Sequence, residues 1–215
     1  EAYIGVLIDD LITKGTKEPY RMFTSRAEYR ILLRQDNADI RLSKKSHDLG
    51  LLEENKLKQV EEKIEMSNKL MRFTKKLSVS PGEINEVLSL KSGSKIKQKV
   101  KAPSIISRPN IGIKDVIRNN KSIKNFINEG LISEGAIEQV EIDIKYSGYI
   151  NREKENADKL KRLEHVKIPI DIDYFKFSSL SNESKEKLNE VKPVNIGQAA
   201  RISGIKPSDV SILLI

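Results

Sequence analysis

Residues 53–78 read EENKLKQVEEKIEMSNKLMRFTKKLS, a long stretch with an unbroken helical pattern. Its apolar residues form a stripe. Leu57, Ile64 and Met71 recur every seven residues, and Val60 and Leu70 widen the stripe. Glutamates such as Glu61 face away from this stripe. Apolar stripes at this spacing are typical of a protein core rather than of a cofactor site. The sequence therefore predicts an amphipathic helix over residues 53–78 that packs against other helices.

The composition of the 215-residue chain favours a helical fold. Hydrophobic residues make up 38% of the sequence, charged residues 33% and aromatic residues 5%, and tryptophan is absent. This balance fits a charged helical protein better than a β-sandwich. The predicted fold class is mainly α: a multi-helix bundle with a short extended segment near the N-terminus, where Pro19 disfavours a helical conformation at Glu18.

Capping residues and apolar spacing predict the other helices. Ser80-Pro81-Gly82-Glu83 is a capping-box pattern with proline at the first helical position. Gly148 interrupts the longest helical run, so we expect a kink there or the close approach of another backbone. The predicted helices cover residues 2–14, 26–34, 43–48, 81–90, 113–118, 122–128, 133–165, 181–191, 196–202 and 208–215.

Three regions are expected along the chain: residues 1–50, a helical subdomain with a basic linker at 51–130, and a C-terminal helical domain at 131–215. The strongest candidate for a connection between domains is the segment 91–110. It combines serine, glycine and lysine with two prolines, and its apolar residues are too scattered to define a face.

Several kinds of site are excluded or disfavoured by residue content. The chain has no cysteine, which excludes disulfides, thiolate chemistry and cysteine-ligated zinc. Its two histidines are His47 and His165, and Asp171 and Asp173 lack the glycine and the distal glutamate of a calcium loop, so we expect no metal. No apolar run is long enough to span a bilayer, and we expect a cytoplasmic protein.

The positive charge is concentrated in one part of the chain. Residues 91–125 contain ten Lys or Arg and a single acid, Asp115, whereas the chain as a whole has a net charge of +8. A local concentration of this kind produces a field that attracts a polyanion. The alternative is a solvated linker whose lysines only keep it soluble.

A second group of cations lies in the block EPYRMFTSRAEYR at residues 18–30. Ser25 and Glu28 form a capping-box pattern, and the predicted helix places Arg26, Tyr29 and Arg30 on roughly one side. Guanidinium groups beside aromatic rings suit phosphates and unpaired bases. Alternatively, these arginines pair with nearby acids and merely hold a loop.

Two features further along the chain leave alternatives open. Tyr146 and Tyr149 could stack on bases, but tyrosines near a helical glycine more often pack between helices. Residues 195–215 have a helix–turn–helix shape. The second helix offers Ser208 and Asp209 instead of base-reading side chains, which disfavours DNA recognition and suits a module that contacts another protein.

Three blocks of this sequence resemble one family. They are residues 18–30, the block YSGYI at 146–150, and the block IGQAARISG at 196–204. The chain is similar to the C-terminal part of the flavoenzymes that modify tRNA uridine to its 5-carboxymethylaminomethyl form, the glucose-inhibited division protein A family. The resemblance implies that residues 1–50 are the end of a flavin domain, whose Gly-x-Gly-x-x-Gly fingerprint does not occur in this sequence and is expected upstream.

The resemblance implies a role and partners. The parent enzyme uses FAD, NADH and a folate one-carbon donor on the wobble uridine, with a GTPase partner and as a homodimer. No cofactor and no catalysis are expected in this chain itself. The expected tRNA-binding residues are Arg21, Arg26, Arg30, Arg34, Lys95, Lys97, Lys99, Lys101, Lys121 and Lys124. The expected GTPase-docking residues are Ile196, Gln198, Arg201, Val210 and Leu213. The alternative function is a basic helical module that binds DNA or serves as a scaffold.

Overall fold

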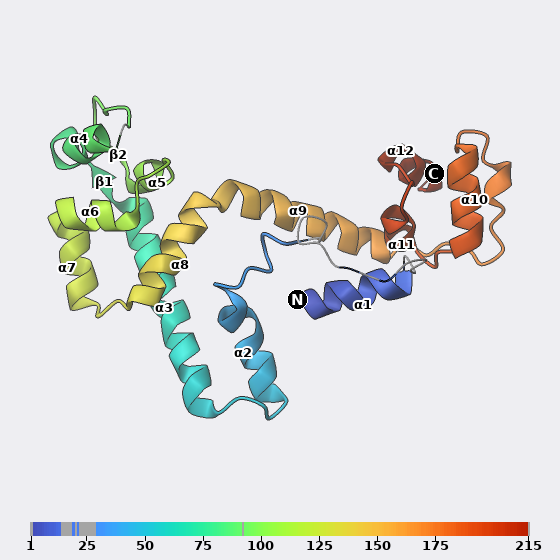
Figure 1. Ribbon diagram of the computed structural model, residues 1–215, viewed down its shortest axis with the longest axis horizontal. Helices are drawn as coiled ribbons and strands as arrows, with labels where there is room; N and C mark the ends of the chain where they lie inside the picture. Colours follow the sequence, from blue (N-terminus) through green and yellow to red (C-terminus); the bar gives the residue numbers. More distant parts are fainter. Residues whose placement is uncertain (1, 14–18, 20, 22–28, 92, 215) are drawn as a thin grey trace. The chain divides into compact units, whose positions relative to one another are not determined.

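The computed structural model describes residues 2–13, 19, 21, 29–91 and 93–214. It contains two compact units: the central unit, residues 34–150, and the terminal unit, residues 1–33 and 151–215. The described residues form twelve α-helices, one 3-10 helix and one two-stranded sheet (Figure 1). The prediction of a mainly α protein is therefore confirmed. The three regions expected from the sequence, with boundaries near 50 and 130, stay a prediction.

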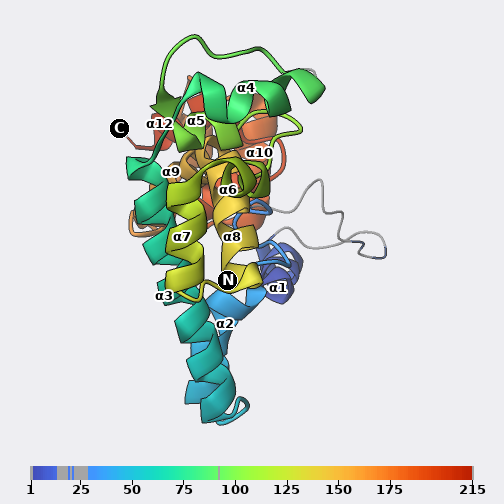
Figure 2. The same cartoon turned by 90° about the vertical axis from the view of Figure 1, so that its left-hand side faces the viewer.

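Helix α3 (Glu54–Lys76) forms the middle of the central unit. It packs against α2 (Ala38–Asp48) and α8 (Glu134–Lys145). Leu70 is fully buried, and Phe73 stacks on Phe126 with ring centroids 4.2 Å apart. Figure 2 shows α3, α7 and α8 side by side. The helix predicted over residues 53–78 is thus confirmed as α3, and of its predicted apolar stripe Leu70 is buried in the core and Met71 packs against it.

Six shorter elements complete the central unit: β1 (Ser78–Val79), α4 (Pro81–Leu90), β2 (Val100–Lys101), α5 (Ala102–Ile106), α6 (Ile113–Asn119) and α7 (Lys121–Glu129). β1 and β2 pair antiparallel, with Ser78 opposite Lys101. The predicted capping box opens α4, because the main-chain N–H of Ser80 donates a hydrogen bond of 2.7 Å to the Glu83 carboxylate.

The interpretation of residues 91–110 as a domain connection is wrong. Apolar side chains of this segment and the adjoining turn are buried in the same core as α3 and α8: Ile96, Ala102, Ile105, Ile106 and Ile111. They lie in a loop, a short helix and a turn, so no single periodicity unites them. The number of apolar residues in this segment, rather than their spacing, was the feature of the sequence that indicated burial.

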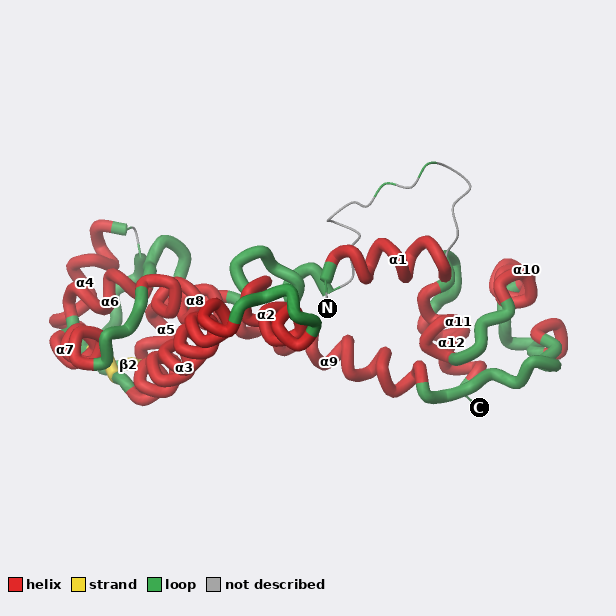
Figure 3. Tube along the Cα trace, turned by 90° about the horizontal axis from the view of Figure 1, so that it is seen from below, coloured by secondary structure: helices red, strands yellow, loops and turns green. Residues whose placement is uncertain are grey.

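The terminal unit has its own smaller core. Its elements are α1 (Tyr3–Thr13), most of α9 (Ser147–Glu164), the 3-10 helix η1 (Tyr174–Lys176), α10 (Asn182–Val191), α11 (Ile196–Arg201) and α12 (Pro207–Leu213). Figure 3 shows α10, α11 and α12 gathered near the C-terminus. Tyr174, Leu188 and Ile196 are buried between them. Ser181 and Asn195 cap α10 and α11 as the sequence predicts, each accepting a hydrogen bond from a main-chain N–H.

Three local predictions differ from the structure. The helix expected to reach Arg34 is a turn over residues 29–33, where Tyr29 has φ 59° and accepts hydrogen bonds from the main-chain N–H groups of Leu32 and Leu33. Residues 22–28 lie outside the described part of the chain. α2 begins at Ala38 rather than after Ser43, because Asn37 already ends the preceding turn.

The third difference concerns the interrupted run at residues 133–165. The break falls at Tyr146, between α8 and α9, rather than at Gly148. A β carbon added at Gly148 would meet nothing within 4 Å, so no other backbone among the described residues approaches it.

Candidate nucleic-acid interface

The loop between α4 and β2 is held against α4 at Ile96, which is buried among its described residues. The side chain of Asn85 accepts a hydrogen bond of 2.8 Å from the main-chain N–H of Ile96 and donates one of 3.0 Å to its carbonyl oxygen. Ile96 is buried, whereas Lys95 and Lys97 on either side of it are exposed. The clamp thus fixes the loop against α4 while both ammonium groups stay in solvent.

The pairing of β1 with β2 brings the C-terminal end of α3 close to the end of the loop between α4 and β2. The ammonium group of Lys101 donates a hydrogen bond of 2.8 Å to the main-chain carbonyl oxygen of Lys76. Lys75 and Lys76, the last two residues of α3, are exposed. The sequence interpretation did not include these two lysines. Their signal was the cluster of cations in the last turns of the predicted helix, a position that the helix dipole favours.

The carboxylate of Glu83 connects this loop with α7. Hydrogen bonds from the Ser80 hydroxyl and the Ser80 main-chain N–H hold the pKa of Glu83 below its ordinary value, with smaller contributions from Asn120 and from the charge of Lys99. Asn120 donates a hydrogen bond of 2.8 Å to Glu83 and caps α7. Lys121, the first residue of α7, therefore lies at the same end of the central unit as Lys99.

We call eight exposed lysines of the central unit the lysine surface: Lys75, Lys76, Lys95, Lys97, Lys99, Lys101, Lys121 and Lys124. All eight side chains are exposed. None of them forms an ion pair with a carboxylate of the described residues. Eight cations on one compact unit are able to bind a polyanion without breaking an ion pair of the described residues.

Other cations of the basic run have structural partners. Lys91 lies 2.6 Å from Asp115, and Lys114 pairs with Glu134. Burial raises the pKa of Asp115, but the hydrogen bonds from Lys91 and from the Gly112 main-chain N–H outweigh it, so the pKa is lowered. Arg108 donates a hydrogen bond to the Ser94 carbonyl oxygen. The charge concentration seen in the sequence is thus partly used to hold the fold.

The arginines expected to bind tRNA occupy different environments. Arg34 has a side chain that is 15% exposed and pairs with Asp36 at 3.1 Å and with Asp143 at 3.4 Å. Arg34 belongs to the central unit, and its ion pairs agree with the alternative in which these arginines pair with nearby acids and hold a loop. Arg21 and Arg30 are exposed and belong to the terminal unit. Arg26 lies outside the described residues.

The expected docking residues mostly form the core of the terminal unit. Ile196 and Val210 are buried, and Leu213 is partly buried against the same cluster. Gln198 accepts a hydrogen bond of 2.9 Å from the Val194 main-chain N–H. Arg201 pairs with Asp9 at 3.5 Å and with Glu164 at 3.2 Å. These side chains can support a docking surface, but the buried ones cannot touch a partner directly.

Close packing explains the third sequence block. A β carbon on Gly197 would lie 2.6 Å from Cγ of Glu164 and 3.0 Å from its main-chain nitrogen, so only glycine lets α11 approach the end of α9 this closely.

The sequence interpretation of Asp209 as an exposed repulsive charge is wrong. Its carboxylate is buried and accepts hydrogen bonds from the Ser184 hydroxyl and the Lys206 main-chain N–H, which caps α12.

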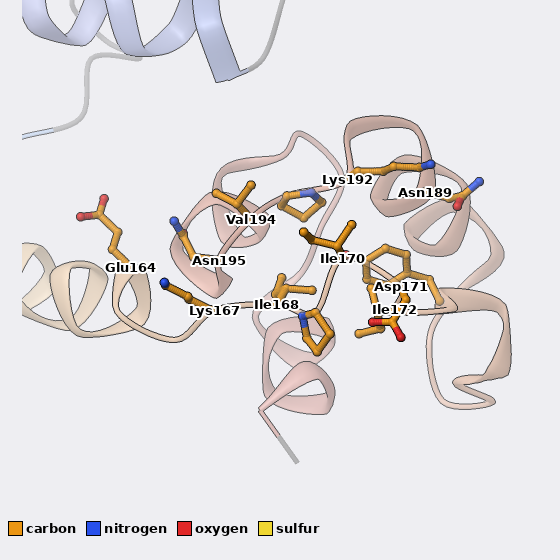
Figure 4. A pocket seen from close by; sticks show the side chains of 13 residues that line it. Glu164, Lys167, Ile168, Ile170, Asp171, Ile172, Asn189, Lys192, Val194 and Asn195 are labelled. Atoms are coloured by element: carbon orange, nitrogen blue, oxygen red, sulfur yellow. The ribbon is translucent and has the colours of Figure 1, made fainter.

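A cavity of about 540 Å³ opens beside this core. Figure 4 shows Ile168, Ile170 and Val194 in the middle of its lining, with Lys167 and Lys192 toward the two ends. Ile170 is fully exposed and Val194 is 65% exposed. The lining also includes the acids Glu164 and Asp171. Exposed apolar side chains with charged residues at their rim are typical of a protein contact surface.

The described residues do not fit a flavin site. A dinucleotide cradle needs a strand that leads through a glycine-rich turn into a helix N-terminus, and the described strands have two residues each. Among the described residues, no group of three or more His, Cys, Asp or Glu could hold a metal ion. No described helix is long and apolar enough to cross a membrane.

Two family models match the chain. The model of the tRNA modifying enzyme MnmG/GidA C-terminal helical domain matches residues 54–154, and the model of its C-terminal helical bundle matches residues 156–215. The MnmG of Christiangramia forsetii, a tRNA uridine 5-carboxymethylaminomethyl modification enzyme, is 55% identical over the whole chain, and that of Bacillus cereus is 43% identical. The chain covers 34% and 33% of these two relatives.

The solved structures agree with these matches. GidA of Aquifex aeolicus in its form II crystal has a TM-score of 0.64 and 40% sequence identity, over 100% of this chain and 32% of that chain. The fold is thus that of a C-terminal helical region from the tRNA-modifying enzymes. The chain belongs to the MnmG/GidA family, whose C-terminal helical region it represents. It spans about a third of the length of the curated relatives it matches.

Proposed function

We propose that this chain is the tRNA-engaging region of an enzyme that installs the carboxymethylaminomethyl group on the wobble uridine. The observation that carries this proposal is the lysine surface, where eight exposed lysines of one compact unit are free of carboxylate partners in the described residues. The family's substrate class is the second support, because the relatives are named for modification of tRNA uridine.

The lysine surface suits the sugar–phosphate backbone rather than the bases. Lysine ammonium groups act as point charges on flexible stems, so they attract phosphates without reading a sequence. If about five of them contact phosphates, the log–log slope of affinity against salt is about −3.5 to −4.5. The chain would then position the tRNA, while chemistry with FAD and NADH takes place in a part of the enzyme outside this chain.

The terminal unit is proposed to dock the GTPase partner. Its support is the cavity with exposed Ile170 and Val194 at its lining. The residues expected from the sequence, such as Ile196 and Val210, would act by holding this surface in shape. We also propose that the parent enzyme is a homodimer and that it is cytoplasmic.

Binding of the chain to three polyanions tests the proposed function. Fluorescence anisotropy is measured over a salt series with labelled tRNA, duplex DNA of equal charge and a heparin fragment. We expect tRNA to bind more tightly than duplex DNA at every salt concentration, with the slope given above. Equal affinity for tRNA and DNA would instead favour the alternative of a DNA-binding or scaffold module.

A further inference from the structure

Two large aromatic side chains of the central unit are left in solvent where α8 passes into α9. Tyr146 is 48% exposed and Tyr149 is 61% exposed. The sequence favoured their packing between helices, but neither lies in a hydrophobic cluster of the described residues. Tyrosine buries a large apolar area when it packs, so two neighbouring exposed rings call for a ligand or a partner.

The backbone that carries the two rings is held in place. The main-chain N–H of Tyr146 donates to the Ile142 carbonyl oxygen at 2.9 Å, and that of Ile150 donates to the Tyr146 carbonyl oxygen at 2.9 Å. The Ser147 hydroxyl donates to the Ile144 carbonyl oxygen at 3.0 Å. The junction is thus fixed by hydrogen bonds on both sides, and only the side chains of the two tyrosines extend from it.

The two rings are close in sequence, on either side of the exposed residues Ser147 and Gly148. Tyr146 is the residue between α8 and α9, and Tyr149 lies in the first turn of α9. Both rings are therefore accessible to a planar group from solvent.

The net charge of the central unit indicates which class of planar ligand the two rings would bind. Residues 34–150 contain 22 Lys and Arg against 16 Asp and Glu, and the lysine surface belongs to the same unit. A cationic body with exposed aromatic rings is the combination that binds single-stranded nucleic acid, with phosphates on the cations and unpaired bases on the rings. The net positive charge of the central unit favours an anionic ligand over a neutral protein partner.

We propose that Tyr146 and Tyr149 form a stacking platform for an unpaired base of the bound tRNA. This inference rests on the proposed function, since it adds base contacts to the phosphate contacts of the lysine surface. Stacking on tyrosine changes affinity by roughly 5- to 150-fold per base. Because stacking involves no phosphate, loss of the rings lowers affinity without changing the salt dependence.

The test compares three variants of the full 215-residue chain in tRNA binding. The double variant Tyr146→Ala/Tyr149→Ala removes both rings, whereas Tyr146→Phe/Tyr149→Phe keeps the rings and removes the hydroxyls. Phe175→Ala removes an exposed ring of the terminal unit and serves as the matched control. We expect the alanine variant to bind tRNA about 10- to 100-fold more weakly with an unchanged salt slope. The phenylalanine variant and the control should bind as the unmodified chain does.

A spectroscopic readout separates stacking from packing. In tRNA with 2-aminopurine in place of an anticodon-loop base, stacking on a ring should quench the fluorescence with the unmodified chain and the phenylalanine variant, but not with the alanine variant. Unchanged affinity and quenching in the alanine variant would overturn the stacking proposal. A lowered melting temperature with unchanged affinity would assign the tyrosines to packing and would overturn it equally. If the unmodified chain did not bind tRNA at all, the proposed function itself would fail.

Discussion

The ammonium group of Lys101 lies 2.8 Å from the main-chain carbonyl oxygen of Lys76, and this hydrogen bond joins β2 to the end of α3. It places lysines that are 25 residues apart in the sequence on one surface. The contact also satisfies one of the carbonyl groups that every helix leaves unpaired at its C-terminus. A structural contact and the gathering of positive charge are thus produced by the same residues.

The first prediction concerns the two lysines that the sequence interpretation missed. The variant Lys75→Glu/Lys76→Glu should weaken tRNA binding by a factor similar to that of Lys97→Glu/Lys99→Glu, because all four lysines belong to the lysine surface. The measurement is anisotropy titration at fixed salt. If the first variant bound tRNA with unchanged affinity while the second lost affinity, Lys75 and Lys76 would not belong to the tRNA-binding surface.

The second prediction assigns Arg34 to folding. Its side chain is mostly buried and pairs with Asp36 and Asp143. Arg34→Ala should lower the free energy of unfolding by about 1–3 kcal/mol, measured in urea, because the partly buried Asp143 loses its charged hydrogen bond. Adding Asp143→Asn should recover part of this loss in a double-mutant cycle. An Arg34→Ala chain of full stability that bound tRNA poorly would contradict the assignment.

The third prediction uses two glycines as a matched pair. Gly197→Ala should destabilise the chain by about 1–3 kcal/mol, because the new β carbon would overlap Glu164 at the contact between α9 and α11. Gly148→Ala should stabilise the chain by about 0.4–1 kcal/mol, because the position is helical and has free space. Both values come from urea unfolding. A neutral or stabilising effect of Gly197→Ala would contradict the packing described for α11.

The fourth prediction is a pH dependence set by Glu83. Its folded-state pKa lies below the ordinary value of 4.5, chiefly because of hydrogen bonds from Ser80. The ionised form therefore stabilises the folded chain above pH 4.5, and this contribution is lost as the pH falls through the folded-state pKa. Ser80→Ala should cost about 0.5–2 kcal/mol at pH 7 and progressively less under acid conditions. An equal cost at every pH would mean that the carboxylate has no part in the cap.

Local signals predicted most of the fold. Ser80, Ser133, Ser181 and Asn195 each precede a helix that starts where expected, because a cap depends on residues that are close in sequence. The stripe in residues 53–78 predicted α3 for the same reason: helical periodicity is contained within the element that it describes.

The errors arose where contacts connect distant residues. Ile96 is buried because Asn85 of α4 clamps it, and Asp209 is buried because Ser184 of α10 donates to it. Neither partner can be recognised from spacing along the chain. The positive charge of residues 91–125 predicted a cationic surface, but only the fold separates Lys91 and Lys114, which pair with acids, from the exposed lysines around them.

The most direct measurement of the central claim is tRNA affinity after charge reversal on the lysine surface. The variant Lys95→Glu/Lys97→Glu/Lys99→Glu/Lys101→Glu is compared with a control that makes the same change of charge elsewhere, at the exposed residues Lys56, Lys154, Lys159 and Arg162. The account predicts that the first variant loses tRNA binding and that the control keeps most of its affinity, with cooperative unfolding in urea showing that both chains are folded. Equal loss in the two variants, or unaltered affinity in the first, would contradict it.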